Sequence, residues 1–220
     1  MHLNKNSLRA FIHMVFLASA YGGTLEEAFV SGNAQQYFFE KTQQETLEKD
    51  VEQPIFQDAR NIFKLIFDGA VKNTGSQKPF RFMQVTVNVK FKGEMYIMEI
   101  DKKFKPSSYI FLTDNFKNEI LEFLGWPEEL HASRNSRPMR KKNETEKRLE
   151  FINNYVSVHF DEDREEYMFT IYPMFSFVKI TDDKKEAAVR VRMQGAWVNV
   201  DVIKSGNGWE ILAISDRSVE

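Results

Sequence analysis

Residues 186–215 read EAAVRVRMQGAWVNVDVIKSGNGWEILAIS, and this stretch decides the fold of the C-terminal part of the chain. Strands that are buried on one face alternate apolar and polar residues with a period of two. The alternation predicts three strands over Glu186–Met193, Ala196–Lys204 and Gly208–Ser215. The connections contain glycines, which supply the positive φ of tight hairpins. The stretch therefore predicts an antiparallel β-meander.

The second and third strands differ in polarity. In the second strand Val198, Val200 and Val202 form the apolar face, whereas Asn199 and Asp201 mark the face toward water. The third strand is apolar on both sides, with Trp209, Ile211 and Ala213 on one face and Glu210, Leu212 and Ile214 on the other. We therefore expect the third strand to be central in the sheet or covered.

The remainder of the chain alternates helical and extended patterns. Apolar residues at i, i+3 and i+4 give the clearest helix, and caps or breakers mark the ends of the others. The expected helices cover residues 24–50 with an interruption at Gly32, Pro54–Ala70, Thr113–Leu124 and Asn143–Val158. The expected strands are a hairpin of Phe80–Phe91 with Glu94–Phe104, a short Tyr109–Leu112, and a long Tyr167–Ile180 bent at Pro173. Segregated helices and antiparallel strands predict an α+β fold with helices packed on a curved antiparallel sheet.

A basic stretch suggests how the chain is organised. Residues 131–142 contain five Arg and Lys residues with a proline and two serines, which is typical of an exposed linker. The linker would separate an N-terminal α+β lobe at 21–130 from a helix and four-strand meander at 143–220. The two lobes could also form one domain.

The first twenty residues match a secretory signal. Lys5 and Arg9 precede the apolar segment Ala10–Ala20, which ends in the small residues that signal cleavage before Tyr21 requires. His13 interrupts the apolar segment, and an amphipathic first helix is the alternative. The signal predicts a secreted or periplasmic protein, and the packed helix predicts a cytoplasmic one.

Composition excludes several classes of protein. The chain has no cysteine, which excludes a disulfide scaffold, a thiolate zinc site and a cysteine nucleophile. The net charge of −2 gives no global basic field for nucleic acid. No apolar run approaches the ~20 residues of a membrane-spanning helix. We expect neither a nucleic-acid partner nor an integral membrane protein.

The C-terminal strands resemble those of NTF2-like (cystatin-like) α+β domains. The residues that carry the resemblance are Ala187–Arg192, the strand that begins Gly195-Ala-Trp197, and the turn and strand Asn207-Gly-Trp-Glu-Ile211. The resemblance covers about thirty residues. It implies helices packed on a strongly curved sheet that often encloses a conical pocket. Because the family includes enzymes, transport factors and envelope scaffolds, the fold does not assign a function.

An acidic cluster follows the last expected helix. His159, Asp161 and Asp163, with Glu165 and Glu166 beside them, are candidate ligands for a divalent cation. The loop lacks the glycine and the distal glutamate of an EF-hand. A solvated acidic turn between a helix and a strand is the alternative.

The basic stretch offers a candidate anion site. Arg137, Arg140, Lys141 and Lys142 could meet phosphate groups or an anionic surface. No aromatic residues alternate with them to stack on bases. A charged flexible linker is the alternative.

A third set of candidates would contact a ligand on the sheet. Trp197 begins a strand after a turn, Asn199 and Asp201 lie on its wet face, and Tyr172 is nearby in the sequence. An exposed strand face also accounts for Asn199 and Asp201. No nucleophile elbow, phosphate loop, dinucleotide fingerprint or zinc-protease motif occurs, and the sequence predicts no cofactor.

These observations favour a non-enzymatic, exported binding or assembly module that acts through a sheet face or an exposed edge strand. Its partner would be another protein or a second copy of the chain. The alternative is an enzyme or small-ligand carrier with an apolar pocket in the same fold.

Overall fold

The structure is a computed structural model, and it describes residues 23–43, 53–72, 78–125, 143–193, 196–206 and 208–216. The helices are α2 (Leu25–Ser31), α3 (Ala34–Gln43), α4 (Pro54–Lys72), α5 (Asp114–Leu124) and α7 (Glu144–Asn153), with a 3₁₀ turn at Lys102–Phe104. The strands are β1 (Arg81–Met83), β2 (Thr86–Phe91), β3 (Glu94–Glu99), β4 (Tyr109–Phe111), β5 (Val158–Asp161), β6 (Glu166–Phe169), β7 (Met174–Ile180), β8 (Glu186–Met193), β9 (Ala196–Ser205) and β10 (Gly208–Asp216). Helices with a mostly antiparallel sheet confirm the α+β class.

The C-terminal meander is confirmed. Strands β7, β8, β9 and β10 follow one another in the sheet, each antiparallel to the next. Val191 lies opposite Val198 and Val189 lies opposite Val200, so the valines of β8 and β9 share one buried face. The period-two pattern identified this face because each strand is covered on one side only.

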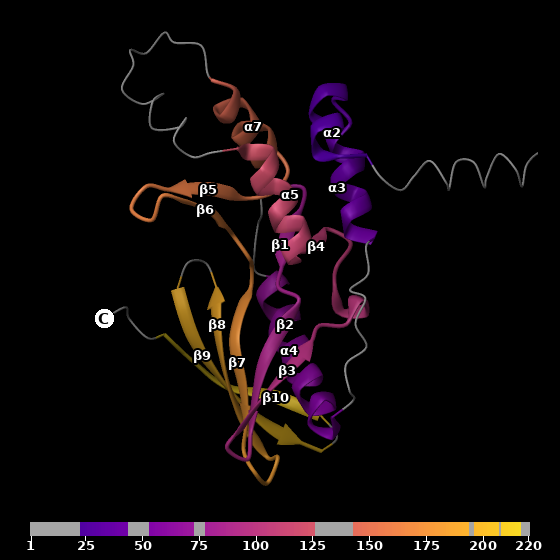
Figure 1. Cartoon of the computed structure of the whole chain (residues 1–220). Coiled ribbons are helices and arrows are strands. Elements are labelled where there is room, and N and C mark those ends of the chain that lie inside the picture. The colour runs from indigo at the N-terminus through magenta and orange to yellow at the C-terminus, as the bar shows by residue number, and fades with distance from the viewer. Residues whose placement is uncertain are drawn as a thin grey trace, which may run out of the picture.

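The meander belongs to a six-stranded sheet with the order β10-β9-β8-β7-β2-β3 (Figure 1). The hairpin of β2 and β3 is added to the meander through a parallel pairing of β2 with β7. The expected strand Phe80–Phe91 is divided into β1 and β2. Gln84 occupies the break, where its Oε1 accepts from the Phe175 backbone N–H at 2.6 Å.

Helix α4 covers one face of the six-stranded sheet and forms the first hydrophobic core. It contacts β2, β7 and the edge strand β10. Phe63 stacks on Phe67 and also meets Phe175 of β7, with ring centroids 4.5 Å apart in the second contact. Burying a side chain of this size stabilises the fold by roughly 1.5–3 kcal/mol. The helix was predicted because its apolar residues recur at i, i+3 and i+4.

A second hydrophobic core joins α2, α3, α5, α7 and the β5–β6 hairpin. The parallel pair β1–β4 lies between the cores, with Phe82 in the second core and Met83 in the first. The two cores therefore interleave along the chain, because α2 and α3 pack with elements that follow residue 143. Each core contains residues from both sides of the basic stretch at residues 131–142, which lies outside the described residues.

Several expected elements end differently in the structure. Strand β3 ends at Glu99, whereas the expected strand continued to Phe104. Helix α7 stops at Asn153 instead of continuing to Val158, because the Asn153 side chain donates to the Val158 carbonyl and accepts from its N–H. Residues 154–157 form the turn that leads into β5. The expected long strand Tyr167–Ile180 consists of β6 and β7, which belong to different sheets on either side of Pro173.

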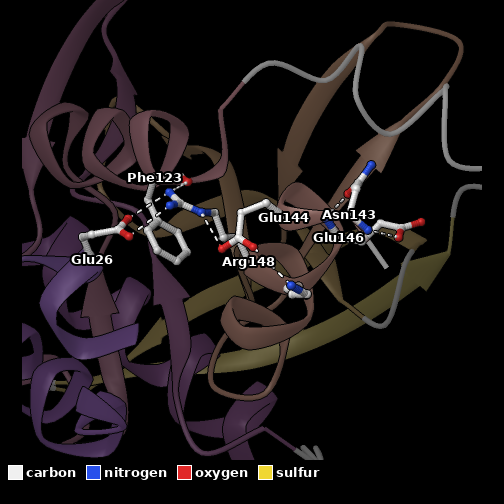
Figure 2. Close-up of polar contacts among 7 residues, drawn as sticks. Glu26, Phe123, Asn143, Glu144, Glu146 and Arg148 are labelled. Atoms are coloured by element: carbon white, nitrogen blue, oxygen red, sulfur yellow. Dashed lines mark hydrogen bonds and ion pairs between the residues drawn. The ribbon is translucent and has the colours of Figure 1, made fainter. Parts of the chain in front are cut away.

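The predicted helix starts at Thr113 and Asn143 and the predicted break at Gly32 agree with the structure. The Thr113 hydroxyl accepts from the Phe116 N–H at the start of α5. Asn143 and Glu146 form a reciprocal capping box at the start of α7 (Figure 2). Gly32, with φ of 74°, ends α2 before α3 begins.

Candidate functional site

Strand β10, at one outer edge of the described sheet, carries three exposed large apolar side chains, and β3 at the other edge carries two, Met95 and Ile97. Ile211, Leu212 and Ile214 are 42%, 65% and 58% exposed. Among the described strands, β10 pairs with β9 alone. The expectation that the last strand is central or covered is therefore wrong for the part of the chain that the structure describes. Its apolar pattern on both faces belongs to an edge strand, which also presents unpaired backbone groups.

A β-bulge interrupts β10 between Ile211 and Ala213. Ile211 lies opposite Val202 and Ile214 lies opposite Val200, and both valines are buried under α4. Directly opposite residues of an antiparallel pair share a face. The bulge therefore places Ile211 and Ile214 on the same face, although regular spacing would put them on opposite faces.

The start of β10 is fixed to helix α4. Trp209 is 7% exposed, and its indole Nε1–H donates to Asp58 Oδ1 at 3.1 Å. Lys204 of β9 donates to the same oxygen at 2.9 Å. The apolar edge is thus presented by a strand whose position is set by packing and by a shared carboxylate.

Three of the predicted ligand residues lie together on β9. Trp197, Asn199 and Asp201 alternate with the buried valines, so they occupy the face of the sheet opposite α4. Arg190 of β8 places its guanidinium 5.2 Å from the centre of the Trp197 ring. Asp201 is exposed and Asn199 is half-buried.

Tyr172, the fourth predicted ligand residue, precedes β7. The guanidinium of Arg81 lies 5.8 Å from the centre of the Tyr172 ring. The described structure brings Trp197, Asn199 and Asp201 onto one open face. It places them in a row along the strand.

Sequence reasoning missed a basic group on this open face. Lys90 lies opposite Lys179, and its ammonium is 4.6 Å from the centre of the Phe177 ring. Phe177 in turn lies opposite Arg190. The alternation within β2 and β7 indicated which residues leave the core, but the parallel pairing that joins these strands has no local sequence signal.

The candidate metal ligands lie at the tip of the β5–β6 hairpin. The Asp161 carboxylate accepts from the backbone N–H groups of Asp163 and Arg164, which is the geometry of a tight turn. His159 is exposed on β5. Within the described residues, no three His, Asp or Glu side chains converge in a way that could hold a metal ion. The arrangement agrees with a solvated acidic turn.

The candidate anion-binding residues Arg137, Arg140, Lys141 and Lys142 lie outside the described residues, as does the predicted signal at 1–20. Among the helices of the described segments, none combines the length and apolarity needed to span a bilayer.

One open hollow of about 510 Å³ lies at the turn end of the sheet, lined by residues 90–95 and 179–182. Its walls come from the β2–β3 and β7–β8 connections.

Two perturbed groups lie elsewhere and hold helix α3 in place. Burial, with Glu119 beside it, raises the pKa of Tyr37 far above its usual range, and its hydroxyl donates to Glu119 at 2.6 Å. Burial lowers the pKa of Lys105 to about 8, and its ammonium donates to the Thr42 and Tyr109 carbonyls. Each group therefore has a structural partner in or beside α3.

No family description, no curated protein and no solved structure matches this chain.

Proposed function

We propose that this protein is a non-enzymatic binding or assembly module that pairs an extended protein segment with the outer edge of β10. The observation that carries the proposal is the exposure of Ile211, Leu212 and Ile214 on an edge strand. An exposed edge offers a row of N–H and C=O groups to a further strand. Backbone hydrogen bonds supply affinity in such pairings, and alternate side chains supply specificity.

The proposal includes an NTF2-like architecture for the sheet and α4. The long helix lies across β2, β7 and β10 on one face, which supports this assignment. It also includes export, for which the apolar segment Ala10–Ala20 after Lys5 and Arg9 is the support. N-terminal sequencing of the mature protein tests export, since a chain that still begins at Met1 contradicts it.

The other edge of the sheet provides a matched control. Strand β3 is also an outer strand, and Ile97 on it is 62% exposed, close to the 65% of Leu212. A lysine at either position adds one charge to an exposed edge without disturbing the core. An effect at Leu212 that is missing at Ile97 therefore reports on β10 itself.

Displayed extended peptides can test the proposed activity. A random peptide library is selected on the wild-type protein, and the enriched peptides are measured against L212K and I97K. We expect L212K to weaken binding at least roughly tenfold, which is about 1.4 kcal/mol, and I97K to leave it unchanged. Equal binding to wild type and L212K would overturn the proposal.

A small-ligand carrier remains a distinct outcome of the same experiments. Apolar dyes would then bind in the hollow at residues 90–95 and 179–182. The selected peptides would not displace these dyes. The edge proposal is favoured because three exposed apolar side chains follow one another along one strand, whereas the hollow is lined mainly by charged and polar residues at the ends of strands.

A further inference from the structure

The apolar edge of β10 also carries a pattern that is complementary to itself. Residues 210–215 read Glu-Ile-Leu-Ala-Ile-Ser. Read in the opposite direction, an isoleucine again comes second and fifth, and an apolar pair again lies between them. A strand with this symmetry can pair antiparallel with an identical strand, which is the natural geometry of a two-fold dimer.

We propose that β10 pairs with β10 of a second copy of this chain around a two-fold axis between Leu212 and Ala213. This inference rests on the proposed function, because it names the occupant of the same edge. Ile211 then lies opposite Ile214 of the second copy, and Leu212 lies opposite Ala213 of the second copy. The two six-stranded sheets become continuous across the interface.

The bulge in β10 makes this register consistent with the faces of the sheet. Residues opposite one another across an antiparallel pair must point to the same side. Positions 211 and 214 would point to opposite sides on a regular strand, and the bulge brings both to the α4 side. In the proposed register each isoleucine therefore meets an isoleucine on the same face. A register centred on Leu212 would set Ile211 against Ala213 of the second copy, on the other face.

Charge disfavours one shifted register. Asp216 ends β10 and would lie opposite Trp209 of the second copy. Within residues 209–215 the charged residue is Glu210. The proposed register places it opposite Ser215 of the second copy, and the two Glu210 residues lie at opposite ends of the paired stretch. Because the bulge leaves one residue of 210–215 without a partner, this stretch spans the four steps from Ile203 to Asn199 of β9, roughly 14 Å along the strands. This exceeds the ~8 Å screening length at physiological ionic strength. A register centred on Ile211 would leave the two glutamates only about 7 Å apart along the strands.

Sedimentation equilibrium of the full chain tests the occupant. We expect a monomer–dimer equilibrium for the wild type, with L212K weakening the dimer at least roughly tenfold and I97K leaving it unchanged. Circular dichroism confirms that each variant is folded, which the exposure of both side chains favours. A dimer that I97K breaks and L212K preserves would place the interface on β3 and overturn the proposal.

Disulfide trapping tests the register, since the chain contains no cysteine of its own. Directly opposite residues have Cβ atoms roughly 4.5–5.5 Å apart, near the range of a disulfide. Under mild oxidation, a mixture of I211C and I214C should form the mixed disulfide in preference to either homodimer. Preferential I211C homodimers would overturn the register.

The outcome for self-pairing differs from the outcome for the proposed function. A chain that stays monomeric at the highest soluble concentration, yet binds selected peptides in a way that L212K abolishes, overturns the second copy as occupant and supports the binding edge. A chain that dimerises as predicted and binds no peptide supports self-assembly alone.

Discussion

Trp209 of the edge strand β10 donates its indole N–H to Asp58 of helix α4, over 3.1 Å. The Asp58 side chain is 15% exposed, and the same carboxylate oxygen accepts from Lys204 at 2.9 Å. One acid therefore ties the start of β10 and the end of β9 to the helix that covers the sheet. This attachment presents the apolar residues that follow in β10 in a fixed position.

Asp58→Ala should destabilise the protein by about 1–3 kcal/mol, because the buried indole N–H and the Lys204 ammonium both lose their acceptor. Asp68→Ala on the same helix is the matched control. Asp68 pairs with Lys64 one turn away, and both side chains are about half exposed, so its loss should cost under about 0.5 kcal/mol. Urea unfolding of both variants measures the difference. Equal losses would show that the contacts at Asp58 do not fix β10.

Tyr37→Phe should lower the free energy of unfolding by about 1–2 kcal/mol. The hydroxyl donates to Glu119 at 2.6 Å between α3 and α5, and Lys41 donates to the other oxygen of that carboxylate. Hydrogen bonds to charged groups in partly buried positions have about this value. Tyr96→Phe removes an exposed hydroxyl bonded to Glu94 and should be nearly neutral. A neutral result at Tyr37 would contradict a stabilising role for this contact in the second core.

Local patterns predicted the elements whose partners are near in sequence. The meander from Glu186 and the helix from Pro54 follow directly from periods of two and 3.6, because each buries a single face. The caps at Thr113 and Asn143 were predictable since capping needs only neighbouring residues. Such signals do not depend on the rest of the fold.

Non-local pairings could not be predicted in this way. The expected strand Phe80–Phe91 divides because Gln84 bonds to Phe175, about ninety positions later in the chain. The edge position of β10 is also a non-local property, because it follows from the order of the described strands in the sheet, in which β10 has β9 as its one neighbour. Apolar residues on both faces of a strand indicate either that the strand is buried in the sheet or that it forms an interface. The amino-acid pattern alone does not distinguish these two cases.

Arg148→Ala should destabilise the second core by about 1–3 kcal/mol. The guanidinium contacts Glu26 at 2.8 Å, donates to the Phe123 carbonyl at 2.7 Å and lies 4.9 Å from the centre of the Phe123 ring (Figure 2). Arg148→Lys should recover only part of this loss, because an ammonium cannot reproduce the planar contacts.

The neighbouring residue provides the control for Arg148. Lys147 forms an exposed pair with Glu144 on α7, so Lys147→Ala should change stability by under about 0.5 kcal/mol. Thermal unfolding followed by circular dichroism compares the three variants. Full recovery by Arg148→Lys would show that charge alone, without guanidinium geometry, joins α2, α5 and α7.

Lys105 should make the stability depend on pH in the alkaline range. Burial, and then the nearby Lys102, lowers the pKa of Lys105 from 10.5 to about 8 in the folded protein. Between these two values the unfolded chain binds more protons than the folded chain. The free energy of unfolding therefore rises as pH increases through this window. The neutral amine still has two N–H groups for the Thr42 and Tyr109 carbonyls, so deprotonation keeps both hydrogen bonds.

Two variants isolate this contribution. Lys105→Met removes the titrating group, and Lys105→Arg keeps a charge that stays protonated throughout the range. Urea unfolding at pH 7, 8, 9 and 10 should show the stability of the wild type rising relative to both variants, with most of the change above pH 8. A relative fall over the same range would mean that the two carbonyls hold the charged amine more strongly than burial opposes it, since the sign of the pH dependence follows the sign of the pKa shift.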